Sequence, residues 1–272
     1  MGSPEFRFYK PDHRLLPYVR YYYVLKSPGN FRTLTFPTGC PQIIFHRKSP
    51  LYIPELKSTQ SVFTISGQVN FPAHVCSGDD GAEMIVAVFR PHTAGMFLGV
   101  PPSAFYNREI SGYDVGNSGL DRLAARILEG GEDSRDGVQT LERWLLETLS
   151  RAPRPSGLLR IGLAVKELMQ APSTPVGRLA ATACLGKKQF ERTFLASVGM
   201  NPKEYARVVR FQKTLWMMQN GRTADAGTAY AGGYADQSHL IREFRTFSGF
   251  TPRRLRDECP CLYSDLFASP VG

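Results

Sequence analysis

The fold is decided by a stretch that occurs twice, first as Gln189-Phe190-Glu191-Arg192-Thr193-Phe194 and again, 50 residues further on, as His239-Leu240-Ile241-Arg242-Glu243-Phe244. A glycine and a proline follow each copy at the same distance, in Gly199-Met200-Asn201-Pro202 and in Gly249-Phe250-Thr251-Pro252. Two copies are too few for a solenoid, in which several repeats stack on one another. The pattern therefore predicts one small helical unit that has been duplicated.

Each copy has the pattern of two helices joined by a tight turn. In the first copy we expect a short alanine-rich helix over Val176–Ala183 and, after three turn residues, a second helix over Lys187–Val198. Phe190, Phe194 and Val198 recur at four-residue steps, so they form one buried stripe on the second helix. In a helix-turn-helix, the opposite and exposed face of that helix enters the major groove of DNA.

The second copy repeats this arrangement, with helices expected over Gly227–Gly232 and Asp236–Ser248. Between the copies, Lys203–Gln219 is expected to form one long helix of roughly 25 Å, which suits two recognition helices placed about one DNA turn apart. One side of this linker helix carries Tyr205, Val208, Gln212, Leu215 and Trp216. The candidate DNA-contacting residues on the two recognition helices are Lys187, Lys188, Glu191, Arg192, Gln237, Ser238, His239, Ile241, Arg242 and Arg245.

Charge is distributed unevenly along the 272 residues, whose net charge is +9. Residues 1–150 hold 15 basic and 15 acidic side chains, whereas residues 151–257 hold 18 basic and 7 acidic ones. A neutral half joined to a strongly basic half indicates that only the second half meets a polyanion.

The first half has the composition of a β-rich domain. Short runs rich in Val, Ile, Phe, Tyr and Thr are separated by Pro, Gly and Asn turns, which favours a small barrel or sandwich over a fold with alternating helices. Strands are predicted at Val19–Leu25, Phe31–Phe36, Gln42–His46, Ser61–Ile65 and Glu83–Arg90, and short helices at Thr93–Gly99 and Leu120–Glu129. Half of its many aromatic rings are expected to face the interior, because alternate side chains of a strand point to opposite faces.

A longer amphipathic helix is predicted over Ser134–Leu149. Its apolar stripe consists of Val138, Leu141, Leu145 and Leu149. The stripe can pack onto its own domain or onto the same helix of a second subunit, and we take it as the candidate dimerisation surface of a homodimer.

The domain boundary is predicted where two prolines and a glycine interrupt the helical pattern and the charge balance changes. Residues 1–6 have the composition of translated cloning sites and are left out of the fold. The remaining segments are a β-rich domain at 7–118, a helical connector at 119–150, a linker at 151–157, a DNA-binding domain at 158–257 and a tail at 258–272.

Residues 158–257 resemble the DNA-binding domain of the AraC/XylS transcription regulators, in which two helix-turn-helix units are joined by a linker helix. The resemblance rests on Leu179-Ala180, Phe190-x-Arg192-x-Phe194, Gly199-Met200-Asn201-Pro202-x-x-Tyr205, Gly233-Tyr234-Ala235-Asp236-Gln237-Ser238-His239-Leu240, Arg242-x-Phe244, Phe247-x-Gly249-Phe250-Thr251-Pro252 and Arg256. The chain departs from the family at three positions. Gly186 replaces the usual capping serine, Thr228 occupies a usually aliphatic position, and Gly232 is expected to add flexibility to the second unit.

The N-terminal half is similar, at fewer positions, to one class of sensory domains of the same family. The similarity rests on its Tyr-rich opening strand, the turn from Pro37 to Pro41 and Phe89-Arg90-Pro91 before a short helix. The resemblance implies a cupin-like barrel that binds a small molecule and dimerises. The expected fold class is thus α+β multidomain, with a β-rich barrel plus helices followed by an all-α domain.

The expected function is sequence-specific binding of double-stranded DNA, controlled by a small-molecule effector, with RNA polymerase as a further partner. The alternative is a DNA-binding protein whose N-terminal half only dimerises or binds a protein partner.

Catalysis is not expected, because no nucleophile elbow, P-loop or dinucleotide fingerprint occurs. The five histidines lack the His-x-His start of metal-dependent cupins, and the five cysteines form no CxxC pair, so no cofactor and no metal are expected. No apolar run is long enough to cross a membrane, and the expected location is cytoplasmic.

Overall fold

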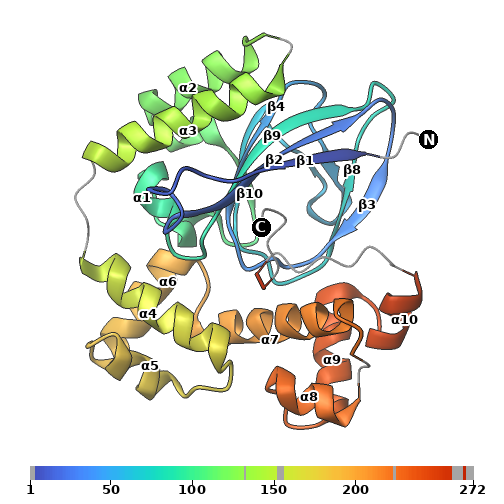
Figure 1. The fold of residues 1–272 in the computed structure, drawn as a ribbon, viewed down its shortest axis with the longest axis vertical. Coiled ribbons are helices and arrows are strands. Elements are labelled where there is room, and N and C mark those ends of the chain that lie inside the picture. The colour runs from blue at the N-terminus through green and yellow to red at the C-terminus, as the bar shows by residue number, and fades with distance from the viewer. Residues whose placement is uncertain (1–3, 132, 152–155, 223–224, 259–265, 268–272) are drawn as a thin grey trace.

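The protein was analysed as a computed structural model, which describes residues 4–131, 133–151, 156–222, 225–258 and 266–267. A β-rich N-terminal domain lies above a helical C-terminal domain (Figure 1). This arrangement confirms the expected fold class. Of the tail expected at 258–272, only Glu258, Leu266 and Phe267 belong to the described residues.

Two antiparallel sheets form the N-terminal domain. The larger has the order β1-β2-β9-β4-β7-β10, and the smaller has the order β3-β8-β5-β6. The strands are β1 (Glu5–Tyr9), β2 (Val19–Ser27), β3 (Arg32–Thr35), β4 (Gln42–His46), β5 (Tyr52–Ile53), β6 (Ser58–Thr59), β7 (Phe63–Ser66), β8 (Ala73–Cys76), β9 (Ala82–Phe89) and β10 (Glu109–Ser111). The five predicted strands correspond to β2, β3, β4, β7 and β9.

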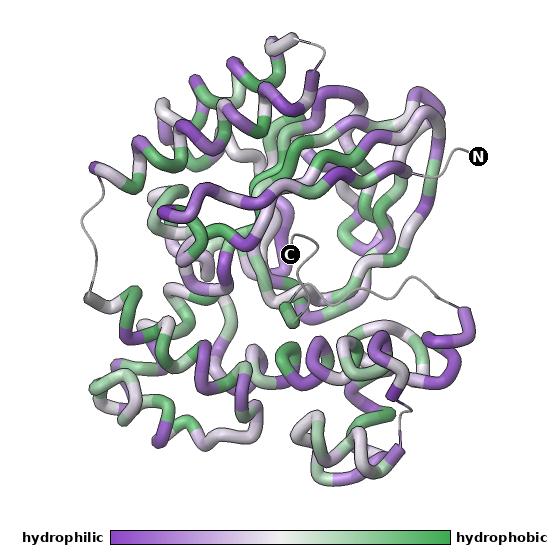
Figure 2. Tube along the Cα trace, in the orientation of Figure 1, coloured by the Kyte–Doolittle hydropathy of each residue, from purple (hydrophilic) through white to green (hydrophobic). Residues whose placement is uncertain are grey.

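Alternation along the strands gives the larger sheet two apolar faces. On β2, Tyr21 and Leu25 belong to one hydrophobic core, whereas Tyr22 and Val24 belong to the other. The first core lies between the two sheets and continues into the C-terminal domain, and the second lies under the helices that cover the outside of the larger sheet. Figure 2 shows the hydrophobic strands gathered in the middle of this domain.

The covering helices are α1 (Ala94–Leu98), α2 (Ser118–Leu128) and α3 (Ser134–Arg151). The apolar stripe of α3 faces inward: Leu141 and Leu145 are fully buried, Val138 is 5% exposed, and Leu149 is partly buried against the same core. Of the two alternatives, the stripe thus packs onto its own domain. These four side chains do not form a surface that is open to a second subunit.

Seven helices form the described part of the C-terminal domain: α4 (Ser156–Gln170), α5 (Val176–Thr182), α6 (Lys187–Val198), α7 (Pro202–Gln219), α8 (Ala226–Gly232), α9 (Gln237–Ser248) and α10 (Pro252–Glu258). Helix α6 ends at Gly199, whose φ of 89° is the left-handed conformation that glycine adopts without strain. Asn201 then caps α7 by accepting a hydrogen bond from the backbone N–H of Glu204, and Pro202 occupies the first turn. The predicted duplication of a helical unit is present.

Several boundaries differ from the sequence-based expectations. Glu5 and Phe6 belong to β1 and pair with Lys26 and Leu25, so leaving residues 1–6 out of the fold was wrong. On α7, Trp216 is 39% exposed and does not share the buried side with Tyr205 and its neighbours. Helix α4 begins at Ser156, inside the segment that was expected to be linker.

Gly232 has a packing role in place of the expected flexibility. A Cβ atom at this position would lie 2.5 Å from Oγ1 of Thr214 on α7 and 3.0 Å from the nearest ring atom of Tyr234. Only glycine lets α8 approach the linker helix so closely.

Candidate DNA-binding surface and N-terminal cavity

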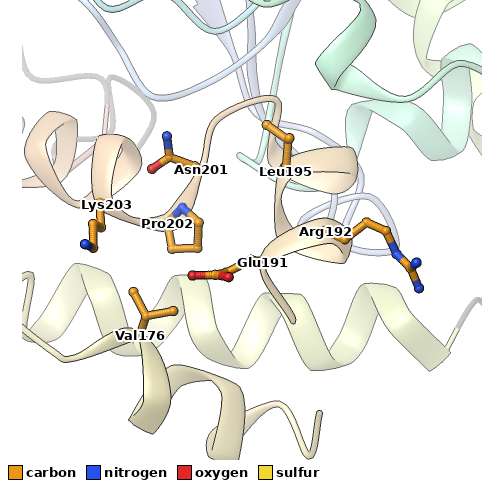
Figure 3. A pocket seen from close by; sticks show the side chains of 7 residues that line it. All are labelled: Val176, Glu191, Arg192, Leu195, Asn201, Pro202 and Lys203. Atoms are coloured by element: carbon orange, nitrogen blue, oxygen red, sulfur yellow. The ribbon is translucent and has the colours of Figure 1, made fainter. Parts of the chain in front are cut away.

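The first recognition helix, α6, presents basic side chains to solvent. Lys187, Lys188 and Arg192 are exposed, and Glu191 is half-buried. No side chain caps the start of the helix, because Gly186 stands at the capping position. A hollow of about 480 Å³ lies between α5, α6 and the start of α7, with Glu191 directed into it and Arg192 directed away (Figure 3).

The second recognition helix, α9, has a side-chain cap at its start, in contrast to α6. The carboxylate of Asp236 caps it by accepting a hydrogen bond of 2.7 Å from the backbone N–H of His239. Gln237, Ser238, Arg242 and Arg245 are exposed. His239 and Ile241 are half-buried, and the ring of His239 packs edge-on against Tyr234.

A buried carboxylate, which sequence reasoning did not single out, joins α9 to the linker helix. Glu243 is 5% exposed, and its carboxylate lies 2.6 Å from Nε of Arg207 and 3.2 Å from Nε of Arg210. Nε2 of His239 lies 3.7 Å from the same carboxylate. The sequence contains a signal for this contact, because position 243 falls between Leu240 and Phe247 on the buried stripe.

A second unpredicted feature is Tyr230 on α8, whose side chain is 85% exposed. Helix α8 is the first helix of the second unit, and in this motif the first helix crosses the DNA backbone. An aromatic ring so exposed on a helix of alanine and glycine is unexplained by packing. It is a candidate contact to the sugar-phosphate backbone.

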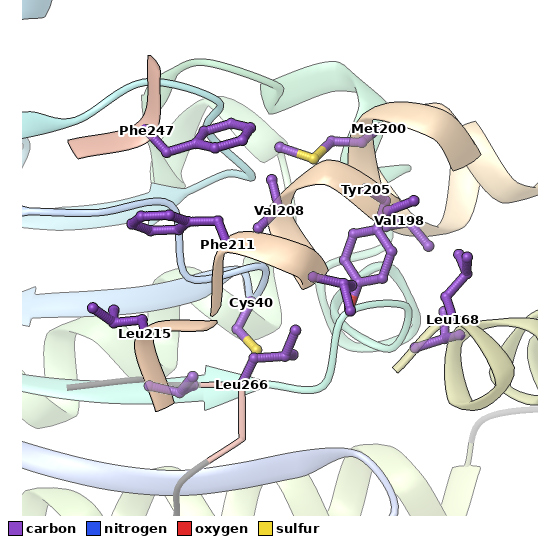
Figure 4. Packing of buried hydrophobic residues seen from close by; sticks show 14 of the residues in the cluster. Cys40, Leu168, Val198, Met200, Tyr205, Val208, Phe211, Leu215, Phe247 and Leu266 are labelled. Carbon is purple, nitrogen blue, oxygen red and sulfur yellow. The ribbon is translucent and has the colours of Figure 1, made fainter. Parts of the chain in front are cut away.

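The two domains share one apolar core along α7, which runs beneath the barrel (Figure 1). Phe211 of α7 packs edge-on against Phe36 of the N-terminal domain, with ring centroids 5.9 Å apart. Figure 4 shows Cys40 of the N-terminal domain and Leu266 of the tail among the side chains of α7. The apolar core is therefore continuous from the barrel wall to the linker helix.

Polar contacts accompany this core near the start and in the middle of α7. Near its start, the hydroxyl of Tyr106 donates a hydrogen bond of 2.9 Å to Glu204. Burial, and then the nearby Glu204 carboxylate, raise the pKa of this phenol. Further along, Gln212 is 1% exposed, and its side-chain amide donates a hydrogen bond of 2.7 Å to the backbone carbonyl of Pro37.

The barrel contains a cavity of about 560 Å³ between the two sheets. Its wall is mainly apolar, and Gln212 of the linker helix forms part of it. The aromatic residues of β2 divide as the alternation rule predicts, whereas Phe36 and Phe71 lie outside the strands. Tyr21, Tyr23, Phe36 and Phe71 line the cavity, whereas Tyr22, Phe45, Phe63 and Phe89 are fully buried in the core beneath the covering helices.

The cavity also contains a carboxyl group, that of Glu109 on β10. Its two oxygens accept hydrogen bonds of 2.9 Å from the Ser66 hydroxyl and 3.0 Å from the Gln60 side-chain amide. Burial raises the pKa of Glu109 to about 7, although both hydrogen bonds favour the ionised form.

The histidines do not converge on one site. His46 is buried in β4, His74 lies 2.7 Å from Glu55, and His92 packs beside Gly162 of α4. Burial lowers the pKa of His46 and of His92 to about 4. Within the described ranges, no three His, Cys, Asp or Glu side chains form a group that could hold a metal ion. No helix among the same residues is long and apolar enough to cross a membrane.

The sequence matches two domain families. Residues 179–258 match a helix-turn-helix domain family, and residues 7–111 match a domain family of unknown function, DUF6597. The C-terminal domain has two helix-turn-helix units on either side of a linker helix, in agreement with this match. Residues 179–258 are therefore similar to the helix-turn-helix domains of AraC-type proteins. A comparison with curated protein sequences gives no match.

Several solved structures match this chain at low sequence identity. ToxT from Vibrio cholerae O395 has a TM-score of 0.44 and 10% identity, over 93% of this chain and 96% of that one. ToxT from strain SCE256 with a bound unsaturated fatty acid has a TM-score of 0.44 and 11% identity, over 93% and 95% of the two chains. The AraC-like transcriptional activator CuxR has a TM-score of 0.24 and 11% identity, over 85% and 91%.

Proposed function

We propose that this protein regulates transcription by binding a specific duplex DNA sequence, and that a small molecule in the N-terminal cavity controls this binding. One observation carries the second part of the proposal: Gln212 belongs to the linker helix and also to the wall of the cavity. A molecule that fills the cavity therefore touches the element that holds the two recognition helices.

The DNA-contacting residues of the proposal are those of the exposed faces of α6 and α9. In this proposal the exposed Lys187 and Lys188 contact phosphates, and the exposed Arg192, Gln237 and Arg242 contact base edges. His239 and Glu191 are half-buried and contribute less, because His239 already lies against Tyr234 and Glu243.

The control step requires a difference in affinity. A ligand shifts DNA binding only when it binds one arrangement of the two domains more tightly than the other. The apolar contact of Phe36 with Phe211 and the hydrogen bond from Gln212 to Pro37 are the contacts that such a ligand would strengthen or weaken.

The alternative, an N-terminal half that only dimerises, is less well supported. The cavity is of a size that accommodates a small ligand, and the apolar stripe of α3 is buried within its own domain. A homodimer and contact with RNA polymerase remain part of the proposal, but a dimer would require a surface other than that stripe. Sedimentation velocity on the full chain measures whether one forms.

The test of the proposal begins with selection of bound sequences from randomised duplex DNA by the full-length protein. Affinity for the selected duplex, and for a shuffled duplex of equal length, is then measured by fluorescence anisotropy at several salt concentrations. We expect preference for the selected duplex and a steep loss of affinity with salt. Equal affinity for the two duplexes at every salt concentration would contradict the proposal.

A further inference from the structure

The chemistry of the cavity wall restricts what it can bind. Among the lining residues of the described chain, Glu109 is the one carboxylate, and none is lysine, arginine or histidine. An acidic ligand would therefore bring a second negative charge into an apolar space without any cation to balance it, which is costly.

Glu109 is held in place without a cation beside it among the described residues that line the cavity. Ser66 and Gln60 each donate one hydrogen bond to it, and both donors are uncharged. A carboxylate has about four acceptor positions, so further donors can be accommodated. Glu109 is half-buried on β10 and is one of the residues that line the cavity.

The opposite edge of the larger sheet provides an aromatic wall. Phe6 and Phe8 on β1 and Tyr21 and Tyr23 on β2 line the cavity, and neighbouring rings have centroids 5.8–6.4 Å apart. Strands β1 and β10 are the two edges of this sheet, so the aromatic wall and Glu109 lie at different ends of the space. Aromatic faces bind flat apolar groups and are also favourable to cations.

We propose that the cavity selects a ligand with a ring-bearing apolar body and a protonated amine that pairs with Glu109. This inference rests on the proposed function, in which the cavity is the effector site. The amine supplies the missing positive charge and donates hydrogen bonds to the unused acceptor positions of the carboxylate, while the body lies against the aromatic wall.

The test uses three probes with the same body and different head groups: 2-(naphthalen-1-yl)ethylamine, 2-(naphthalen-1-yl)ethanol and naphthalen-1-ylacetic acid. Each is titrated into the full-length protein near neutral pH by isothermal titration calorimetry. We expect the amine to bind at least about tenfold more tightly than the alcohol, since hydrogen bonds to charged groups are the stronger ones. The acid is expected to bind most weakly.

The variant Glu109→Gln keeps the shape of the side chain and removes its charge. In this variant the affinity for the amine should fall to that for the alcohol, while the affinity for the alcohol stays within about twofold. Glu55→Gln is the matched control, because the carboxylate of Glu55 pairs with His74 and does not line the cavity. It should leave all three affinities unchanged.

Two results would overturn the inference: the acid binding as tightly as the amine, or an unchanged affinity of Glu109→Gln for the amine. If the alcohol still binds in either case, the cavity remains a ligand site and only the ligand class is wrong. If none of the three probes binds, the inference and the small-molecule part of the proposed function are both contradicted.

Discussion

The side-chain amide of Gln212 donates a hydrogen bond to the backbone carbonyl of Pro37, and the two atoms are 2.7 Å apart. The oxygen of the same side chain lies 3.5 Å from the backbone N–H of Leu266, within reach of a weak hydrogen bond. One glutamine thus joins the linker helix, the barrel and the tail.

Replacement of Gln212 by alanine should destabilise the protein by about 1–3 kcal/mol, because it leaves the buried carbonyl of Pro37 without its donor. Urea unfolding of the full chain measures this change. Gln139→Ala is the control, since Gln139 is exposed on α3 and its loss should change little. Equal midpoints for the two variants would show that the hydrogen bond contributes nothing.

Loss of Glu243 should weaken the attachment of the second recognition helix. Glu243→Gln leaves Arg207 and Arg210 without their carboxylate, and we expect a loss of roughly 2–4 kcal/mol, reduced by the partial exposure of Arg207. Thermal unfolding measures this loss of stability. The control variant is Glu258→Gln, which removes an exposed ion pair with Arg254 and should cost less than about 1 kcal/mol. A smaller effect for Glu243 than for Glu258 would contradict the structural role.

We expect substitutions on the two recognition helices to change DNA binding in different ways. Arg242→Ala should cost about 1–3 kcal/mol on the selected duplex and relax preference at one or two base pairs. Lys187→Ala should weaken binding to selected and shuffled duplexes alike and reduce the salt slope by about one. Anisotropy titrations of both variants on both duplexes measure this. If Lys187→Ala alters preference among sequences, its assignment as a phosphate contact is wrong.

Because the apolar stripe of α3 is buried, we expect charged substitutions in it to disrupt folding of the domain. Leu141→Asp combined with Leu145→Asp places two carboxylates in a closed apolar core, so we expect an unfolded or aggregated N-terminal domain rather than a folded monomer. Circular dichroism and light scattering measure it. Leu159→Asp, at a position 71% exposed on α4, should leave both signals unchanged. A folded double variant would mean that the stripe is not core.

Glu109 should impose a specific pH dependence on stability. Its pKa is about 7 in the folded protein and near its ordinary value in the unfolded chain, so the folded state binds more protons between pH about 4.5 and 7. The contribution of this residue is therefore present at low pH and is lost as the pH rises through about 7.

Compared with the parent chain, Glu109→Gln should become progressively more stable across this interval, by roughly 1–3 kcal/mol in total. His46, whose folded pKa is about 4, works in the opposite direction: its contribution is present above pH about 6.5 and is lost as the pH falls towards 4. Unfolding midpoints of both chains, measured as a function of pH, test the difference. A difference independent of pH would show that Glu109 does not titrate as described.

The sequence was most informative where a period repeats over several turns or strands. The four-residue steps of Phe190, Phe194 and Val198 located α6 at its observed bounds, and the apolar run of β4 did the same. Strands β5 and β6 have only two residues each, and β8 and β10 have no fully buried position, so their sequences carry no comparable pattern.

The site was predicted less completely than the fold. The exposed faces of α6 and α9 follow from helical geometry, because a buried stripe fixes the opposite face. Which face of each strand would line a cavity depends on how the two sheets face one another, and no local pattern contains that information. Gln212 and Glu109 became recognisable only when residues distant in sequence were brought together.

The position of α7 beneath the barrel limits how such a protein can be recombined. Val208 and Phe211 pack in a core that contains residues of both domains, so neither domain has a complete surface when it is cut out at the linker. Grafting the N-terminal domain onto the DNA-binding domain of another protein would expose the apolar side of the helix unless the barrel face that touches it were transplanted as well. The two halves are encoded in series, yet they share one apolar core and are not interchangeable modules.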